Sequence, residues 1–526
     1  MFDLVIKNGL LVDGTGAPRF AADLAVKDGK IVHIGPCDGE AVQELDAQGA
    51  VVAPGFIDVH GHSDLFAFAD PQRESKLAQG ITTEICCQCG MGPAPVGRET
   101  YPFHKGYYES QGAPIYPGNE SFLTFGAYLD YMEQLPMGIN TAYFIPHGMV
   151  RMAVMGLSPA KATAQQLEAM AALVEEGMAA GAIGLSSGLM YAPGSFGDYD
   201  EFLTLCRVVG KYDGIYTSHI RDQGNLLIEC VTETLDIARS AGARANISHA
   251  KASGRINWGK IATTCAMVRD AGFPATQDVY PYTAGSTIIS STLPPKYLKM
   301  GSAAFLEHIA DTSNRQALED AIFNPTEQFD NQLVSCGYEG ILIATATVTS
   351  DAVGKTVAQY ATGLGISPFE AYIKIMADNA MGVTYIGFSM AQEDVDYLIA
   401  DPLCMFGCDA LYMPGMPMTH PRAIGTFPRI LGRSVREQGI ITLEEAIRKM
   451  TGMAAQVYGL KGKGLLMPGM DADLVIFDPV TIVDRADYAN PFQPNKGIGG
   501  VCVAGQLVFD GGAATGALPG GVLRVR

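Results

Sequence analysis

The sequence predicts an α/β protein with a TIM-like (β/α)8 barrel, a small β-sandwich domain built from both chain ends, and a lid inserted in the barrel. Eight short apolar segments follow one another through the middle of the chain, and helical patterns separate several of them. Strand–helix alternation repeated eight times is typical of a parallel barrel. β-rich runs at both ends and one long interruption of the alternation predict the other two parts.

The β-sandwich domain is expected to comprise residues 1–53 and 465–526. The first piece alternates short β-rich runs with Asn-Gly and Asp-Gly pairs, which are strong hairpin signals. The second piece contains similar runs, among them "DADLVIFDP" and "VCVAGQLVFDGG". Neither piece is large enough for a good core of its own, so we expect them to join and to bring the termini together.

The barrel is expected to span residues 54–464. Between its seventh and eighth strands, residues 283–350 are too long for a loop and carry helical and β patterns of their own. We expect this insertion to cover the barrel mouth as a lid. The eight predicted strands are residues 55–62, 81–88, 141–148, 182–189, 214–220, 244–250, 274–282 and 404–410.

Composition limits the classes of partner. The chain has 526 residues and a formal net charge of −19, which argues against nucleic acid or an anionic membrane surface. It has no run of eighteen apolar residues, and the start of the sequence has no basic region or apolar segment typical of a signal peptide, so a cytoplasmic location is expected. The eleven cysteines fit reduced packing residues or metal ligands better than a disulfide framework. The oligomeric state is left open.

Histidines gather at the C-terminal ends of the predicted barrel strands, where barrel enzymes place their active sites. His60 and His62 are two residues apart on one strand, so both side chains leave the same face. Alone, this pair could equally be two core histidines. His219 and His249 on two further strand ends make a metal site with several ligands the favoured interpretation, and Asp409 ends the eighth strand in the same way.

The stretch "ITTEICCQCG" places Cys89 at the tip of the second strand. A zinc finger would need a second cysteine or histidine pair at short spacing, which the chain lacks. A redox pair of Cys86 and Cys89 would open a helix, but the following "GMGPAPV" is rich in glycine and proline. Two neighbouring metal ions would need a bridging anion, and the Cys89 thiolate is a candidate. Cys86 and Cys87 are expected to pack as small apolar residues.

Taken together, these segments resemble the N-acyl-D-amino-acid deacylases (D-aminoacylases) of the amidohydrolase superfamily. The similar stretches include "APGFIDVHGHSD", "GITTEICCQCGMGPAP", "YTSHIRDQG", "ISHAKASG" and "HPRAIGTFPRILGR". The resemblance implies the terminal β-sandwich, the lid and selectivity for D-amino acids. It implies one tightly bound zinc ion held by Cys89, His219 and His249. It also implies a second, weaker zinc site formed by His60, His62 and a bridging Cys89, with Asp409 nearby.

The implied reaction is zinc-dependent hydrolysis of the amide bond of N-acyl-D-amino acids, which gives a carboxylate and a free D-amino acid. Metal-activated water is the expected nucleophile, with Asp409 as general base and then general acid. Lys251 and Arg422 are the expected cationic donors to the substrate carboxylate, with Tyr191 and Tyr282 as neutral donors. A surface or capping role is the alternative for each of the four. The resemblance implies an arginine near the lid in members that act on acidic D-amino acids. Here "STLPPKYL" has Pro295 followed by Lys296, which favours neutral or apolar substrate side chains.

Two other functions are compatible with a barrel of this kind. A cyclic amidase of the hydantoinase or dihydropyrimidinase type shares this fold, but it normally bridges its metals with a carboxylated lysine on strand four. The fourth predicted strand, "AIGLSSGLM", contains no lysine. A non-catalytic scaffold of the same fold would usually have lost metal ligands, whereas all of them are present here.

Overall fold

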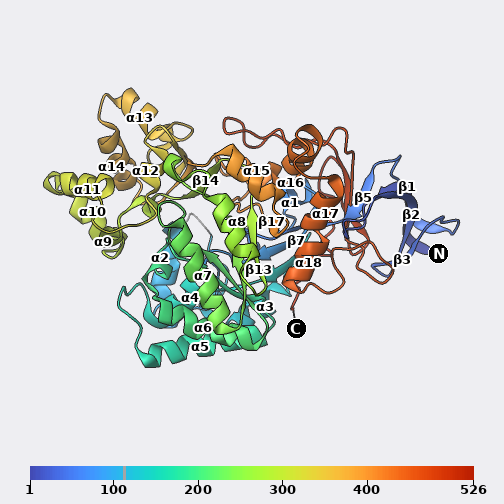
Figure 1. The fold of residues 1–526 in the computed structure, drawn as a ribbon, viewed down its shortest axis with the longest axis horizontal. Helices are drawn as coiled ribbons and strands as arrows, with labels where there is room; N and C mark the ends of the chain where they lie inside the picture. The colour runs from blue at the N-terminus through green and yellow to red at the C-terminus, as the bar shows by residue number, and fades with distance from the viewer. Residues whose placement is uncertain (111–113, 526) are drawn as a thin grey trace.

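A closed barrel of eight parallel strands forms the centre of the computed structural model, which describes residues 1–110 and 114–525 (Figure 1). The first three barrel strands pair in chain order, and so do the third to the seventh strand, which then pairs with the eighth. A hydrogen bond from Ile183 N to Tyr143 O (2.9 Å) connects the third strand to the fourth. A bond from Val59 N to Phe406 O (3.3 Å) closes the barrel between the first strand and the eighth.

All eight predicted strands are confirmed, and the third is divided into the short strands β8 and β9. The barrel strands are β6 (Phe56–Asp58), β7 (Ile81–Cys86), β8 (Asn140–Tyr143), β9 (Ile145–Pro146), β10 (Gly184–Gly188), β11 (Ile215–His219), β12 (Arg244–Ile247), β13 (Ala275–Val279) and β17 (Cys404–Phe406).

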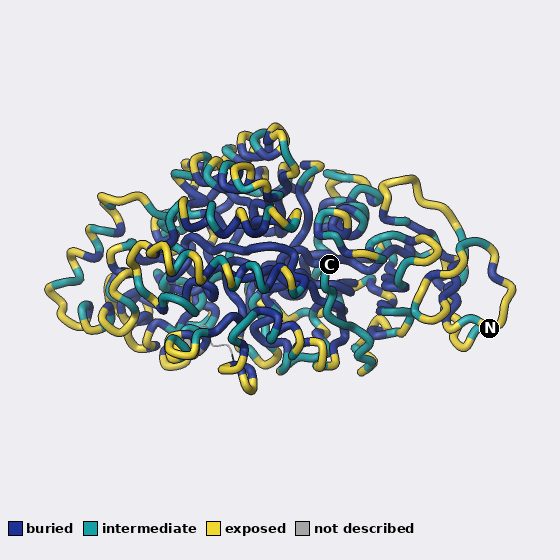
Figure 2. Tube along the Cα trace, turned by 90° about the horizontal axis from the view of Figure 1, so that it is seen from below, coloured by how far each residue is buried: buried dark blue, intermediate teal, exposed yellow. Residues whose placement is uncertain are grey.

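Helices cover the outside of the barrel, and consecutive ones lie side by side. Their apolar residues face the strands, so the buried part of the chain lies inside and the exposed residues lie on the outer helix faces and loops (Figure 2). Thr163 caps the longest of these helices together with Gln166. The helices between successive strands include α5 (Ala164–Ala179), α6 (Tyr199–Lys211), α7 (Leu227–Ala241), α8 (Ile261–Arg269) and α15 (Gln392–Ala400).

Strands from both chain ends form one continuous eight-stranded sheet at one side of the barrel. The two ends meet where β5 pairs antiparallel with β18, and β1 pairs with three strands, so the sheet is branched. Leu4, Ile6, Val52 and Leu474 contribute to its core. The strands are β1 (Phe2–Leu11), β2 (Phe20–Lys27), β3 (Lys30–Ile34), β4 (Ala41–Asp46), β5 (Val51–Pro54), β18 (Leu474–Phe477), β19 (Ile498–Val503) and β20 (Gln506–Phe509).

The last residues leave this sheet and return to the barrel. Gly520 N donates to Met137 O (2.8 Å), and Leu523 N donates to Thr141 O (2.7 Å) beside the third barrel strand. Val525 N donates to Gly181 O (3.0 Å) at the start of the fourth. By its contacts, the segment 519–525 therefore belongs to the N-terminal end of the barrel, although the sequence placed it in the terminal domain.

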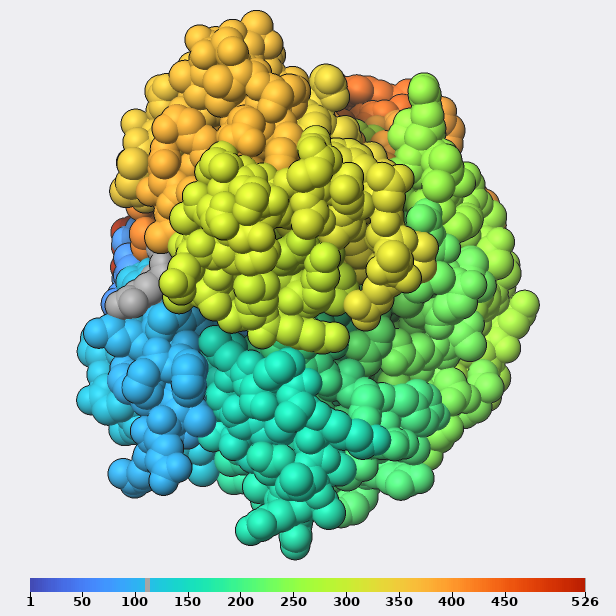
Figure 3. Space-filling model, turned by 90° about the vertical axis from the view of Figure 1, so that its left-hand side faces the viewer, coloured from blue at the N-terminus to red at the C-terminus, as the bar shows by residue number. Residues whose placement is uncertain are grey.

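The insertion is larger than the sequence predicted. Its sheet consists of β14 (Ala284–Ile288), β15 (Ile341–Ala346) and β16 (Val383–Phe388), and β16 pairs with both of the others. The predicted end at residue 350 is thus corrected to Phe388, because the central strand of the sheet is the last to be reached along the chain. Ile343, Leu318 and Phe369 belong to a separate apolar core within this unit. Figure 3 shows the insertion lying across one end of the barrel.

The insertion also contributes six helices to the described part of the chain, and these surround the small sheet. They are α9 (Pro295–Leu298), α10 (Ser302–Ala310), α11 (Arg315–Phe323), α12 (Gln332–Cys336), α13 (Val357–Leu364) and α14 (Pro368–Asp378). Within residues 1–110 and 114–525, no helix combines the length and apolar character that a membrane crossing requires.

Candidate metal centre

The barrel strands bring the predicted metal ligands together at their C-terminal ends. His60 and His62 follow β6, Cys89 follows β7, His219 ends β11 and His249 follows β12. All five side chains are buried, as is Asp409 after β17. Most of them line one pocket, and the insertion forms its opposite wall.

Cys89 lies at the centre of this group. Its Sγ is 3.3 Å from His60 Nε2, 3.3 Å from His249 Nε2 and 3.7 Å from His219 Nδ1. Asp409 Oδ1 lies 3.2 Å from His62 Nε2 and 3.6 Å from His60 Nε2. Ligand atoms of four of these residues lie within 4.8 Å of one another, close enough to hold a metal ion together: His60, Cys89, His249 and Asp409.

The backbone is strained where it presents these side chains. Cys89, His249 and Asp409 have φ angles of 56°, 34° and 48°, in the left-handed region that residues other than glycine rarely adopt. Such conformations persist only where the surroundings hold them in place, and they gather at functional sites. The bends turn three side chains from three different strands toward one point.

Neighbouring charges favour the ionised forms of the two acids in the group. Burial would raise the pKa of the Cys89 thiol, but the imidazoles of His60 and His249 hold this pKa well below its usual value. Burial would likewise raise the pKa of the Asp409 carboxyl, but Arg422 and His249 hold that pKa well below its usual range. A thiolate and a carboxylate among imidazoles are the donor types that a transition-metal ion binds.

Two of the four predicted substrate-binding residues lie at the pocket. Lys251 Nζ is 2.9 Å from His249 Nδ1 and donates to Gln223 Oε1 (3.2 Å). Burial lowers the pKa of Lys251 to about 8. Tyr191 lines the same pocket, and its hydroxyl is 2.9 Å from Thr287 Oγ1 of the insertion.

The other two predicted residues lie elsewhere. Arg422 is buried behind Asp409, with Nη1 2.8 Å from Asp409 Oδ2 and Nη2 donating to Ser286 O (3.2 Å). Tyr282 is not among the residues that line the pocket, and its hydroxyl is 3.5 Å from Asp484 Oδ2, so its role as a substrate donor stays a prediction. Of the two tyrosines that flank Pro281, Tyr280 is the one that lines the pocket.

The sequence interpretation missed several residues at the site. Tyr280 could have been found, because the predicted strand included it directly after Val279. Gln332 enters the pocket from α12 of the insertion, and nothing in the local pattern indicates this. Asp278 on β13 contacts two of the metal-ligand candidates, His60 and His249. Gln223 contacts Lys251 and lies 3.2 Å from His249 Nδ1.

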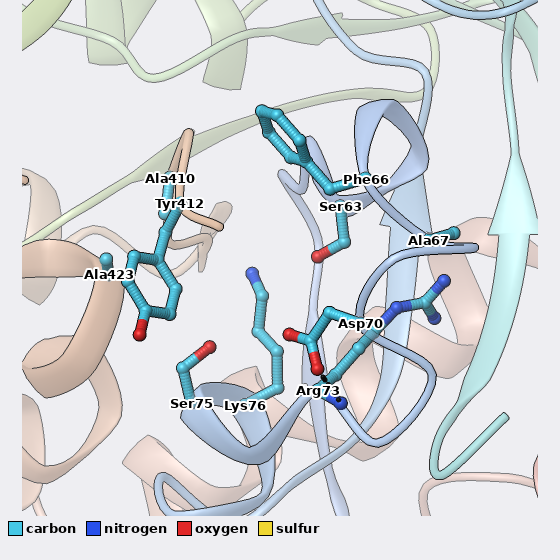
Figure 4. A pocket seen from close by; sticks show the side chains of 10 residues that line it. All are labelled: Ser63, Phe66, Ala67, Asp70, Arg73, Ser75, Lys76, Ala410, Tyr412 and Ala423. Carbon is cyan, nitrogen blue, oxygen red and sulfur yellow. Dashed lines mark hydrogen bonds between the residues drawn. The ribbon is translucent and has the colours of Figure 1, made fainter. Parts of the chain in front are cut away.

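A second, smaller pocket lies beside the segment that follows β6, the first barrel strand (Figure 4). The ammonium group of Lys76 stands between Tyr412 and Ser63 in this view. It is 2.6 Å from Asp58 Oδ2, and Asp58 Oδ1 accepts hydrogen bonds from the backbone N–H groups of His60 (3.1 Å) and Cys408 (2.9 Å). These groups support the backbone from which His60 and Asp409 project.

Imidazoles, a thiolate and a carboxylate that converge at the C-terminal end of a parallel barrel define the class of this protein: a metal-dependent hydrolase of the amidohydrolase type. The amidohydrolase family matches residues 43–203 and 318–509. D-aminoacylase of Alcaligenes xylosoxydans xylosoxydans is 32% identical over 533 residues, which is 99% of this chain and 97% of that relative. The chain therefore belongs to the amidohydrolase family, in the branch of the D-aminoacylases.

Solved structures support the same family assignment. The crystal structure of N-acyl-D-glutamate deacylase from Bordetella bronchiseptica, complexed with zinc and a phosphonate mimic of the tetrahedral intermediate, has a TM-score of 0.84 at 33% identity and covers 99% of both chains. L-hydantoinase from Arthrobacter aurescens has a TM-score of 0.56 at 17% identity over 100% of both chains. The hydantoinase likeness shows the fold alone, so the linear amidase interpretation is favoured over the cyclic one.

Proposed function

We propose that this protein hydrolyses the amide bond of N-acyl-D-amino acids and releases a carboxylate and a free D-amino acid. The observation that carries this proposal is the convergence of the buried ligand group with Lys251 in one pocket. The ligand group would hold the metal that polarises the acyl carbonyl, and the Lys251 ammonium would bind the carboxylate of the substrate. The relatives' activities on N-acyl-D-amino acids support the choice of substrate class.

Zinc is the metal that the donor set fits best. Zinc–sulfur and zinc–nitrogen bonds of about 2.3 and 2.0–2.1 Å at a tetrahedral angle place the two ligand atoms about 3.6 Å apart. The distances from Cys89 Sγ to its three imidazole neighbours, 3.3 to 3.7 Å, fit this requirement. His219 presents Nδ1 to Cys89 Sγ at 3.7 Å, and His62 presents Nε2 to Asp409 Oδ1 at 3.2 Å, so each ring turns one nitrogen toward the ligand group. We propose one tight zinc site at Cys89, His219 and His249, and a weaker one at His60 and His62 that shares Cys89.

Asp409 and Arg422, beside the metal-ligand candidates, have separate roles in the proposed reaction. When bound, zinc supplies Lewis-acid chemistry, since it polarises a carbonyl and lowers the pKa of a water molecule to about 7. Asp409 accepts the proton of the attacking water and delivers it to the departing amine. Arg422 holds Asp409 Oδ2, so that Oδ1 faces the metal ligands. We therefore assign Arg422 to the orientation of Asp409 and not, as the sequence suggested, to the substrate carboxylate.

The wall of the pocket favours a substrate with one carboxylate and a neutral side chain. Among the described residues that line it, Lys251 is the one charged group outside the metal-ligand group. A second carboxylate, as in an acidic amino acid, would therefore be desolvated without a cationic partner. The rest of the wall is neutral and includes Met91, Met190, Leu411, Tyr385 and Gln332.

The test is a screen of N-acetyl and N-formyl derivatives of D- and L-amino acids, with hydantoins alongside, against the zinc-loaded enzyme. We expect turnover of D-enantiomers with neutral side chains such as methionine or leucine, and much slower turnover of N-acyl-D-aspartate and N-acyl-D-glutamate. Turnover of hydantoins together with inactivity on every N-acyl-D-amino acid would contradict the proposal. A preference for the acidic substrates would contradict only the side-chain assignment.

Replacing Lys251 with methionine is expected to raise KM by roughly 10- to 100-fold with a smaller effect on kcat, because a charge-assisted hydrogen bond contributes about 1.5–3 kcal/mol. The pKa of Lys251 is about 8, so the ammonium loses its proton as pH rises through this value. KM of the unmodified enzyme should therefore rise above pH 8, and the variant should lack this rise. Steady-state kinetics between pH 6 and 10 measure both effects. Lys211→Met, on the outer face of α6, is the matched control, and equal KM values for all three proteins would exclude the role.

A further inference from the structure

Asp278 is a buried carboxylate in the barrel interior, directly beneath the candidate metal ligands. It lies on β13, a strand that contributes no ligand, and its side chain is fully buried. Oδ1 is 3.1 Å from His60 Nδ1 and accepts a hydrogen bond from the backbone N–H of His249 (2.8 Å). Oδ2 accepts a hydrogen bond from Asn246 Nδ2 (2.7 Å). One carboxylate thus contacts two ligands that come from different strands.

The contact with His60 decides which ring nitrogen faces Cys89. A carboxylate oxygen at Nδ1 stabilises the tautomer that carries its proton there, which leaves Nε2 with a free lone pair. Nε2 is the atom that lies 3.3 Å from Cys89 Sγ and 3.6 Å from Asp409 Oδ1. Asp278 therefore points the metal-binding nitrogen of His60 at the centre of the ligand group.

The contact with His249 supports a strained backbone. His249 has a φ of 34°, which is unfavourable for a residue with a side chain. The hydrogen bond from its N–H to Asp278 holds this conformation, and with it the direction of the His249 ring toward Cys89. Asn246 on β12 holds Asp278 in turn, and its Nδ2 also donates to Thr217 Oγ1 on β11 (3.1 Å).

We propose that Asp278 is a positioning residue that couples the two halves of the metal centre, since it fixes His60 of the weaker site and His249 of the tight site through one carboxylate. This inference rests on the metal centre of the proposed function. It does not depend on which amide is the substrate. It predicts that a change at Asp278 weakens both zinc-binding steps, although Asp278 is not itself a ligand.

The test replaces Asp278 with asparagine and measures zinc binding by competition with a chromophoric chelator. In the variant, an amide NH2 group would oppose the NH2 group of Asn246, or the amide would turn and lose both ligand contacts. We expect zinc affinity to fall by about 10- to 100-fold, the usual loss when a partner of a metal ligand is removed. The visible absorption of the cobalt-substituted protein should change as well, because the ligand geometry changes.

A double variant and a matched control make the result specific. In D278N combined with Asn246→Asp, the amide of residue 278 can donate to the new carboxylate and turn its oxygen to His60 and His249, so most of the lost zinc affinity should return. Asp473→Asn is the control, because Asp473 is a buried carboxylate that also accepts a backbone N–H and an asparagine NH2, from Ala504 and Asn140, far from the pocket. The control should lower the free energy of unfolding and leave zinc affinity unchanged.

Three outcomes would overturn this proposal alone. Asp278→Asn could bind zinc as the unmodified protein does, the Asp473→Asn control could lose zinc to the same degree, or the double variant could fail to recover affinity although it folds. An unmodified protein that binds no zinc would overturn this proposal and the metal centre together. Zinc binding that depends on Asp278, in a protein inactive on every N-acyl-D-amino acid, would support the positioning role and contradict only the proposed substrate.

Discussion

Asp409→Asn is expected to lower kcat by about 10²- to 10⁴-fold, the usual contribution of a general acid–base group, while zinc content stays close to that of the unmodified enzyme. Asparagine has nearly the same shape and can still accept a hydrogen bond from Arg422, which lies 2.8 Å from the Asp409 carboxylate. It cannot take the proton of a water molecule. KM should change little, because the substrate carboxylate is assigned to Lys251.

Metal analysis and steady-state kinetics on the same preparation measure this prediction. Asp394→Asn is a suitable control, because Asp394 is also buried and accepts the backbone N–H of Gly259 at 3.0 Å, outside the pocket lining. Near-normal turnover of Asp409→Asn with full zinc content would show that Asp409 is not the base. A loss of activity that parallels a loss of zinc would assign Asp409 to metal binding alone.

Cys89→Ser is expected to remove zinc and activity together. Burial opposes ionisation of the Cys89 thiol, but the neighbouring imidazoles lower its pKa and favour the thiolate, whereas a serine hydroxyl would stay protonated there and bind zinc far more weakly. Because Cys89 contacts three imidazoles, the loss of zinc affinity should exceed the roughly 10- to 100-fold expected when only an outer partner of a ligand is removed. Chelator competition gives the affinity, and activity assays in excess zinc give the catalytic effect.

Cys86→Ser separates this effect from packing. Cys86 is the last residue of β7, the strand that Cys89 follows, and it belongs to the apolar core, where burial raises the pKa of its thiol well above the usual value. We expect the Cys86 variant to unfold at a lower temperature and to bind zinc as the unmodified protein does. Equal zinc affinities for the Cys86 and Cys89 variants would contradict the special role of Cys89.

The metal-ligand candidates could be predicted from the sequence because strand geometry is local. Side chains at strand tips in a parallel barrel must converge, so His60, Cys89, His219 and His249 needed only the strand assignments to be placed together. The left-handed backbone at Cys89 and His249 could not be predicted, since neither residue is glycine or asparagine. Such conformations depend on distant partners such as Asp278.

Features that depend on distant pairing were predicted less well. The insertion extends to Phe388 because β16 pairs with β14 across about a hundred residues, and no local pattern near residue 350 could indicate this. Tyr280 lies in the pocket lining because the chain turns at Pro281, and the sequence does not indicate the direction of that turn. Gln332 reaches the pocket only through the tertiary position of the insertion.

The pairing of the two chain ends also determines when this protein can fold during synthesis. β5 pairs with β18, whose residues are made more than four hundred positions later, and residues 519–525 complete contacts along the third barrel strand. The five N-terminal strands therefore leave the ribosome long before their partner exists, with an open sheet edge that could pair with other chains. Removal of the last sixty residues would delete β18 and leave the β5 edge permanently unpaired, although the truncation removes none of the metal-ligand candidates.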